Sequence, residues 1–194
     1  MTTLVRTDPD SARADPANDP GLDPQLDPPG DPEQVARQIL LRRLTDRPRS
    51  RAELAQALAA KRVPGDVAAR LLDRFSEVGL VDDAAFARSW IESRQRGRGL
   101  ARRALAHELR AKGIDTETAR AALDDVDPAD ERERARRLVH RKLPSLARVD
   151  RAVAQRRLIG MLARKGYPAG LATQIVAAEL AVERADVPAG PDDP

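Results

Sequence analysis

Apolar residues in the long central part of the chain recur at spacings of three and four, as they do along one face of an α-helix. Val67, Leu71, Leu72, Phe75 and Val78 form one such stripe, and a glycine follows it, where helices commonly end. Alanine, leucine, arginine and glutamate, which are good helix formers, dominate this part of the chain, and alternating β-branched runs are absent. The pattern predicts an all-α body.

The apolar pattern also repeats itself along the chain. Segments 54–72, 105–123 and 158–176 align at offsets of 51 and 53 residues. The aligned positions include the leucine sets Leu54, Leu105, Leu158 and Leu58, Leu109, Leu162, and the lysines Lys61, Lys112, Lys165. A unit of about 50 residues is marginally stable alone, and stacking buries its apolar stripe against its neighbours. We therefore predict three tandem three-helix repeats, at 33–81, 82–126 and 127–183, that form an elongated, curved right-handed or open helical solenoid.

Helix-capping residues mark where individual helices begin. In the first repeat we predict helices near 33–44, 50–61 and 65–78, and Ser50 with Glu53 forms a capping box for the second of these. Asp82 or Asp83 caps the first helix of the second repeat, and Asp115 caps its third. Asp127 and Pro128 start the third repeat, whose first connection, around 144–150, is longer than its counterparts.

The two ends of the chain differ from the body in composition and charge. Residues 1–32 contain seven Asp, seven Pro and two Arg, so they carry a net charge of −5 and few large apolar side chains. Segments 1–32 and 184–194 are therefore predicted to be disordered. The body, 33–182, has a net charge of +11, which favours polyanions or acidic protein surfaces as partners. One hypothesis is that the acidic N-terminal segment masks the basic body, so that deleting it raises DNA affinity.

Several functional classes find no support in the composition. The chain has no cysteine, two histidines, four aromatic residues and no apolar run long enough to span a membrane. The aspartates that could ligate a cation lie at predicted helix boundaries, where capping accounts for them. We therefore expect a cytoplasmic protein that is not an enzyme and has no cofactor, metal or membrane partner.

Arginine clusters are the strongest functional signal in the body. The densest contains Arg94, Arg96, Arg98, Arg102 and Arg103, and no acidic residue occurs between Glu92 and Glu108. Guanidinium groups suit phosphates and carboxylates, so we assign these arginines, with Arg49 and Arg51, to partner or DNA binding. A further cluster in the third repeat alternates with Glu131 and Glu133 and is interpreted as a solvated helix face.

The region around these arginines resembles the RecX family of regulatory proteins. The resemblance rests on Gly79-Leu80-Val81-Asp82-Asp83, Phe86-Ala87, Trp90-Ile91 and Arg94, then a basic glycine-containing turn, Leu105, Glu108-Leu109 and Lys112-Gly113-Ile114, and it covers about residues 34–182. It implies a curved monomer that binds the RecA recombinase and its filament on single-stranded DNA. It further implies inhibition of RecA ATPase, strand exchange and co-protease activity, which modulates DNA repair, homologous recombination and the SOS response. Asp82, Asp83, Phe86 and Trp90 are assigned to maintaining the fold.

Two other classes remain open at this stage. A helix-turn-helix-like module acting directly on single-stranded or double-stranded DNA would bind it without a partner and with steep salt dependence. A helical adaptor would bind a protein with weak salt dependence. The sequence also leaves open whether a RecX-like chain lies in the filament groove or caps the filament end.

Overall fold

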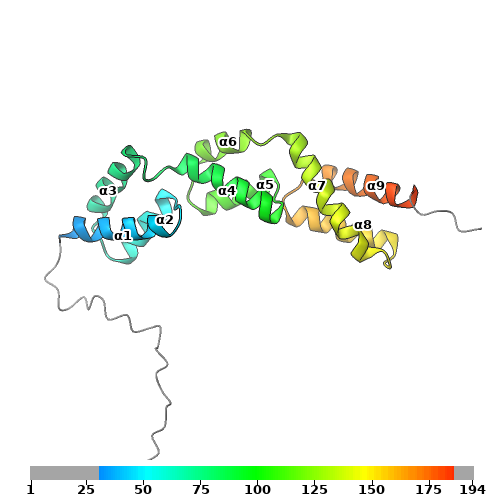
Figure 1. The fold of residues 1–194 in the computed structure, drawn as a ribbon, viewed down its shortest axis with the longest axis horizontal. Helices are drawn as coiled ribbons and strands as arrows, with labels where there is room; N and C mark the ends of the chain where they lie inside the picture. The colour runs from blue at the N-terminus through cyan, green and yellow to red at the C-terminus, as the bar shows by residue number, and fades with distance from the viewer. Residues whose placement is uncertain (1–30, 186–194) are drawn as a thin grey trace, which may run out of the picture.

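The computed structural model describes residues 31–185, with side chains to residue 182, and this part of the chain is all-α. Residues 1–30 and 186–194, which make up most of the two predicted disordered tails, lie outside the described residues. Three groups of helices follow one another along a single long axis and form an arc (Figure 1). The prediction of an elongated, curved row of three-helix units is confirmed. Among the described residues, no helix is both long and apolar enough to cross a membrane.

The first unit contains α1 (Pro32–Asp46), α2 (Arg51–Ala60) and α3 (Gly65–Glu77). The predicted capping box is present, because the Ser50 hydroxyl accepts from the Glu53 amide and the Glu53 carboxylate accepts from the Ser50 amide. The prediction that the disordered tail extends to residue 32 is wrong at its end. Asp31 accepts a hydrogen bond from the Glu33 amide and Pro32 occupies the first turn, so both residues belong to the start of α1.

The second unit contains α4 (Asp83–Arg98), α5 (Arg102–Ala111) and α6 (Thr116–Asp124). Asp82 caps α4 by accepting from the Ala85 amide at 2.8 Å, and Asp115 caps α6 by accepting from the Thr118 amide at 2.9 Å. Both predicted caps of this unit are therefore present.

The third unit contains α7 (Pro128–Lys142), the 3-10 helix η1 (Leu143–Leu146), α8 (Arg151–Arg164) and α9 (Ala169–Ala185). Asp127 caps α7, as predicted, with Pro128 in its first turn. The longer connection predicted here is η1 and the turn after it. α9 continues to Ala185, beyond the predicted start of the C-terminal tail at 184.

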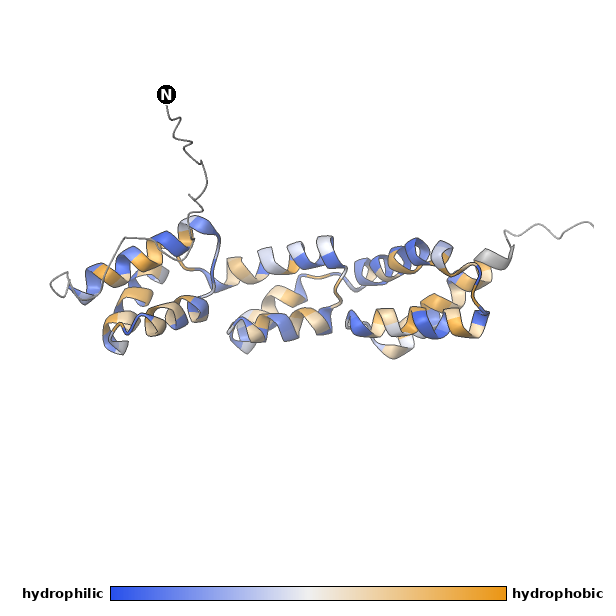
Figure 2. Cartoon of the chain, turned by 90° about the horizontal axis from the view of Figure 1, so that it is seen from below, coloured by the Kyte–Doolittle hydropathy of each residue, from blue (hydrophilic) through white to orange (hydrophobic). Residues whose placement is uncertain are grey.

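Each unit has its own apolar core (Figure 2). The repeated leucines form the centre of these cores: Leu54, Leu58, Leu105, Leu109, Leu158 and Leu162 all have no exposed surface (0%). Val78 is the exception in the predicted stripe of the first unit, because it is the residue that ends α3 and is 64% exposed. The predicted helix over 65–78 is therefore one residue too long at its C-terminal end.

Adjacent units meet through the same contact. The loop after the second helix of one unit packs on the beginning of the second helix of the unit before it. The Ser50 hydroxyl donates to the Lys112 carbonyl at 2.7 Å, and the Ala101 amide donates to the Lys165 carbonyl at 2.9 Å. The glycine after each lysine has a positive φ, 73° at Gly113 and 90° at Gly166. A Cβ at Gly166 would lie 2.6 Å from the backbone nitrogen of Ala104, so only glycine fits this approach.

Among residues 31–185 no helical unit precedes the first one, and the sequence of the first unit differs at this point. Arg62 occupies the position of Gly113 and Gly166 and also has a positive φ of 58°. A side chain is tolerated at residue 62 because, in the described chain, no earlier helix packs against that loop. The repeat is therefore regular in backbone conformation, whereas its glycines are required only at the junctions.

Candidate functional site

The densest predicted arginine cluster spans the end of α4 and the start of α5. The prediction that its members lack acidic partners is wrong for most of them. Arg94 and Arg98 both pair with Glu108, at 2.8 and 3.3 Å. Arg96 pairs with Glu92, and Arg102 pairs with Asp124 at the end of α6 while donating to the Leu123 carbonyl at 2.8 Å. Among the described residues, Arg103 has no carboxylate within 4.0 Å, and its side chain is exposed.

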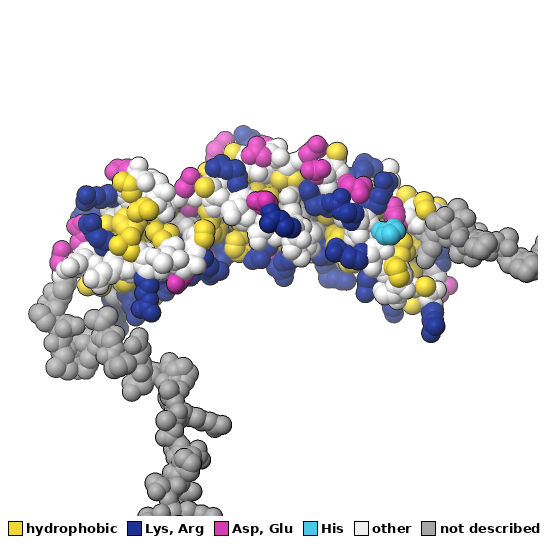
Figure 3. Space-filling view, in the orientation of Figure 1, with side chains coloured by type: hydrophobic (Ala, Val, Ile, Leu, Met, Phe, Trp, Pro, Cys, Tyr) yellow, Lys and Arg dark blue, Asp and Glu magenta, His cyan; other side chains and the backbone are white. Residues whose placement is uncertain are grey.

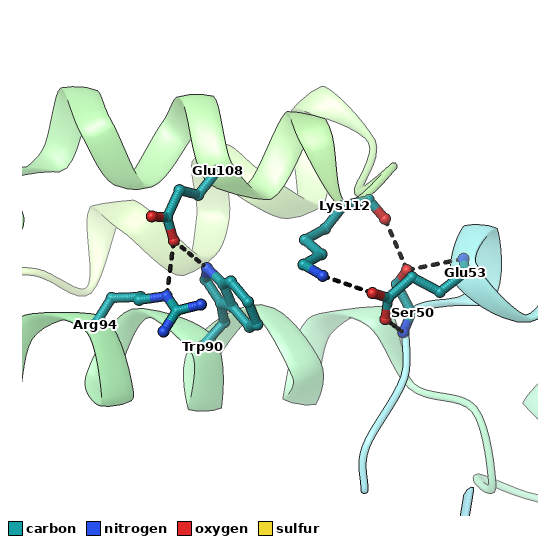
Figure 4. Close-up of polar contacts among 6 residues, drawn as sticks. All are labelled: Ser50, Glu53, Trp90, Arg94, Glu108 and Lys112. Carbon is teal, nitrogen blue, oxygen red and sulfur yellow. Dashed lines mark hydrogen bonds and ion pairs between the residues drawn. The ribbon is translucent and has the colours of Figure 1, made fainter. Parts of the chain in front are cut away.

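Trp90 belongs to a polar cluster at the edge of the second core. Its Nε1 donates to Glu108 Oε2 at 2.9 Å, and the same oxygen accepts from Arg94 Nε at 2.8 Å (Figure 4). The Arg94 guanidinium lies 4.0 Å from the centre of the indole ring, and Phe86 stacks on that ring at 5.7 Å. Phe86 is buried, whereas Trp90 is half-buried. Arg94 is therefore fixed by two interactions and serves the fold of the second unit.

Lys112 joins this cluster to the first unit. Its Nζ lies 4.8 Å from the centre of the Trp90 ring and donates to Glu53 Oε1 at 2.6 Å (Figure 4). Burial raises the pKa of Glu53, but the hydrogen bonds from Lys112 and the Ser50 amide outweigh it, so the pKa lies below its usual value. Ser50 and Glu53, which cap the start of α2 in the first unit, therefore also bind the second unit through Lys112.

The smaller predicted cluster, Arg49 and Arg51, lies at the same junction. Arg51 Nη2 pairs with Asp73 at 2.6 Å, and its backbone amide donates to Asp83 Oδ1 at 2.8 Å. Burial raises the pKa of Asp83, and the hydrogen bond from the Arg51 amide partly opposes this. The Arg49 Nε is buried and has no hydrogen-bond partner among the described residues. The structure places Arg51 and Asp83 in a contact between units.

A groove of about 1150 Å³ lies between α4 of the second unit and α7 of the third. Seven Lys or Arg residues and three Glu residues line this groove, so its lining has a net positive charge. The basic residues are Arg96, Arg98, Arg134, Arg136, Arg137, Arg141 and Lys165. We call this surface the basic groove. It brings two predicted arginines, Arg96 and Arg98, together with the arginines of α7 that the sequence pattern had indicated to be a solvated face.

The charges in the basic groove are only partly neutralised. Arg136 pairs with Glu179 at 3.1 Å and Arg137 pairs with Glu133 at 3.6 Å, whereas Arg141 has no carboxylate within 4.0 Å in the part of the chain that the structure describes. Two guanidinium nitrogens of Arg134, Nε and Nη2, are buried without a hydrogen-bond partner among the described residues. Burial, followed by the charges of Arg141 and Arg98, lowers the pKa of Lys165. The groove is therefore a region of concentrated positive potential that suits an anionic partner.

Sequence reasoning did not identify the contacts of Glu108 and Lys112, or the α7 side of the groove. Glu108 is ten residues from Arg98 in sequence, and a helix-spacing rule finds pairs only three or four residues apart. The repeat alignment marked Lys112 but did not show what it contacts. No group of three or more His, Cys, Asp or Glu able to hold a metal occurs within residues 31–185.

The three-helix units define a class of tandem helical repeat protein whose second and third units frame a basic groove. Family models match all three units: RecX, first three-helix domain, at 36–75; second three-helix domain, at 82–123; and third three-helix domain, at 130–176. The chain therefore belongs to the RecX family of regulatory proteins, as its sequence resemblance had implied.

Individual relatives agree with this assignment. The chain is 53% identical to Regulatory protein RecX of Thermobifida fusca over 152 residues, covering 78% of this chain and 82% of that one. It is 50% identical to Regulatory protein RecX of Streptomyces coelicolor, covering 78% and 80%. The crystal structure of RecX from Lactobacillus salivarius superposes with a TM-score of 0.71 at 19% identity, covering 78% of this chain and 98% of that one. The fold is thus that of other RecX proteins.

Proposed function

We propose that this chain binds RecA and its filament on single-stranded DNA and inhibits the RecA ATPase, strand exchange and co-protease activities. Membership of the RecX regulatory family carries the proposal, since the three family domains together span every unit of the fold. In this role the chain acts in the cytoplasm as a monomer, catalyses no reaction itself and limits recombination and the SOS response.

The shape and charge of the molecule support a partner that is itself extended and acidic. Lys and Arg side chains gather along the concave lower edge in Figure 3, whereas many acidic side chains lie on the opposite, convex edge. A curved row of units can touch several protomers of a filament at once, and linked contacts raise the apparent affinity. Positive charge suits both acidic protein surfaces and the DNA phosphates inside the filament.

Within the predicted binding residues, we assign different parts to different arginines. Arg96, Arg98 and Arg103 have exposed side chains and are proposed to face the partner, the first two from the basic groove. Arg51, Arg94 and Arg102 form ion pairs that stabilise the units, so they are proposed to support the binding surface and not to contact the partner.

The test is the ATPase rate of the cognate RecA on single-stranded DNA, titrated with this protein. We expect inhibition at substoichiometric protein. The groove variant R96Q/R137Q/R141Q removes three charges from exposed side chains and should raise the half-inhibitory concentration about tenfold, if each contact contributes about 0.5 kcal/mol. The matched control R42Q/R70Q/R74Q removes three exposed charges from the first unit, outside the basic groove. Equal loss in both variants would contradict the role of the groove.

Binding to the same DNA without RecA distinguishes the alternative function. The basic groove would also fit phosphates directly, as a helix-turn-helix-like DNA-binding module requires. Tight, strongly salt-dependent DNA binding with no effect on the ATPase would establish that alternative and refute the regulator.

A further inference from the structure

A second hollow, with a different chemistry, lies on the junction between the second and third units. Its volume is about 780 Å³, and α5, α6, α7 and the start of α9 contribute to it. Its floor is apolar and includes Ala106, Ile114, Leu123 and Leu171. Ile114 and Leu123 are 4% exposed, whereas Ala106 and Leu171 are half-buried and offer apolar surface to a partner. We call this surface the apolar hollow.

Arginines surround the apolar hollow. Five line it, and Glu131 is the one carboxylate among its lining residues. Arg103, Arg110 and Arg132 are exposed and have no carboxylate within 4.0 Å among the described residues; Arg132 donates instead to Gln174 at 3.1 Å. The other two lining arginines are paired, Arg102 with Asp124 and Arg120 with Glu117. The hollow therefore combines an apolar floor with a rim in which three of the five arginines have no carboxylate partner in the described chain.

This combination selects one kind of occupant. An apolar side chain gains free energy by covering the floor, and carboxylates beside it gain from the guanidinium rim. A nucleic-acid backbone would satisfy the rim but would leave the floor uncovered, which makes the basic groove the better surface for phosphates. An acidic protein segment with one or two large apolar side chains satisfies both parts, as in other groove-and-anchor interfaces.

We propose that the apolar hollow is the docking site for such an acidic, apolar-anchored segment on the surface of RecA in its filament. The anchor side chain rests on Ile114, Leu123 and Leu171, and the carboxylates of the segment face Arg103, Arg110 and Arg132. This inference rests on the proposed function for the identity of the partner and adds where, and by which chemistry, the partner is held.

The absence of cysteine from the whole sequence allows a direct test. A single cysteine at Thr116, on the lining of the hollow, is labelled with a benzophenone maleimide. The control label is S89C, an exposed position on α4 that lines neither surface. Each labelled protein is mixed with RecA filaments on single-stranded DNA and irradiated, and the cross-linked peptides are identified by mass spectrometry. We expect T116C to capture an acid-rich RecA peptide that contains a large apolar residue, and S89C not to capture it.

Affinity gives an independent readout. R103Q/R110Q/R132Q should raise the half-inhibitory concentration about tenfold, again from about 0.5 kcal/mol for each charge, while R42Q/R70Q/R74Q changes it less than about twofold. Leu171→Ala should weaken inhibition several-fold through the floor, with circular dichroism confirming that the variant is folded. Wild-type melting behaviour with unchanged inhibition in these hollow variants would overturn the docking site.

The outcomes separate this inference from the proposed function. If the wild-type protein does not inhibit RecA, and neither labelled T116C nor labelled S89C cross-links to it, the proposed function fails, and the docking site with it. If the wild type inhibits RecA but T116C captures only DNA, or only residues 1–30 of this chain, the proposed function stands and the docking site is refuted. Those two captures would identify a nucleic acid, or the acidic N-terminal segment, as the occupant instead.

Discussion

Replacing Gly113 by alanine tests the close approach between the first two units. Gly113 has a φ of 73°, and a Cβ added there would overlap the Cβ of Ala52 at the start of α2. Gly79 has the same φ of 73°, but an added Cβ would meet nothing within 4 Å. Gly79→Ala therefore introduces left-handed strain alone, whereas Gly113→Ala introduces the same strain together with a collision.

The two costs can be worked out separately. An alanine in the left-handed region costs about 1–2 kcal/mol, and its restriction of the unfolded chain returns about 0.4–1 kcal/mol. We therefore expect Gly79→Ala to lower the free energy of unfolding by about 1 kcal/mol. Forcing an extra methyl group into a packed contact adds about 1–3 kcal/mol, so Gly113→Ala should cost about 2–4 kcal/mol.

A double variant isolates the collision. Ala52 is the near neighbour that an added Cβ at Gly113 would meet, so Ala52→Gly opens the required space. Ala52→Gly alone should cost about 0.5–1 kcal/mol as a glycine within a helix. The double variant, A52G/G113A, should be destabilised by about 1–3 kcal/mol less than the sum of the losses measured for the two single variants.

The assay is urea unfolding followed by two probes. Far-ultraviolet circular dichroism reports on all three units, and fluorescence of the single tryptophan, Trp90, reports on the second. If Gly113→Ala and Gly79→Ala destabilise the protein equally, and A52G gives no relief, the glycine serves the turn alone and the argument from close approach is refuted.

Three further predictions concern single side chains. Ser50→Ala removes a buried hydroxyl that caps α2 and donates to the Lys112 carbonyl, and should lower the free energy of unfolding by about 1–3 kcal/mol in urea titrations. The control is Ser145→Ala, which removes an exposed hydroxyl that donates to the Lys142 carbonyl three residues earlier. Glu108→Ala leaves Trp90 Nε1 and Arg94 without their acceptor and should cost about 1–3 kcal/mol; a loss below about 0.5 kcal/mol would show that the cluster adds little. Burial raises the pKa of Tyr167 to about 12, so this single tyrosine should ionise near pH 12 in an ultraviolet titration of the folded protein. Because an unfolded tyrosine ionises near pH 10, the free energy of unfolding should fall as the pH rises from about 10 towards 12. Ionisation near pH 10 in the folded protein would contradict the burial of Tyr167.

Local rules account for most of the fold that could be predicted. Asp82, Asp115 and Asp127 each interact with amides two or three residues away, so their roles are visible in a short stretch of sequence. The repeated leucines identified the cores because a helical period and a repeat both select the same positions. Val78 was misplaced because periodicity does not show where a helix stops packing against its neighbours.

The candidate site was harder to predict because its contacts join distant residues. Counting acids along the sequence suggested unpaired arginines, whereas the folding of α5 against α4 brings Glu108 to Arg94 and Arg98. The basic groove combines Arg96 with Arg137 and Arg141, which are some forty residues further on and in another unit. Neither spacing nor composition specifies which helices of two adjacent repeats face each other.

The difference between Arg62 and the junction glycines has a consequence for how such a protein can change its length in evolution. A copy of the second unit inserted after itself would bring its own Lys112-Gly113 loop, which already fits the start of a preceding helix. A unit added ahead of the first would meet the Arg62 side chain, whose Cβ occupies the space that glycine leaves open at the other junctions. Internal duplication can therefore lengthen the row in one step, whereas growth at the N-terminal end requires Arg62 to change first.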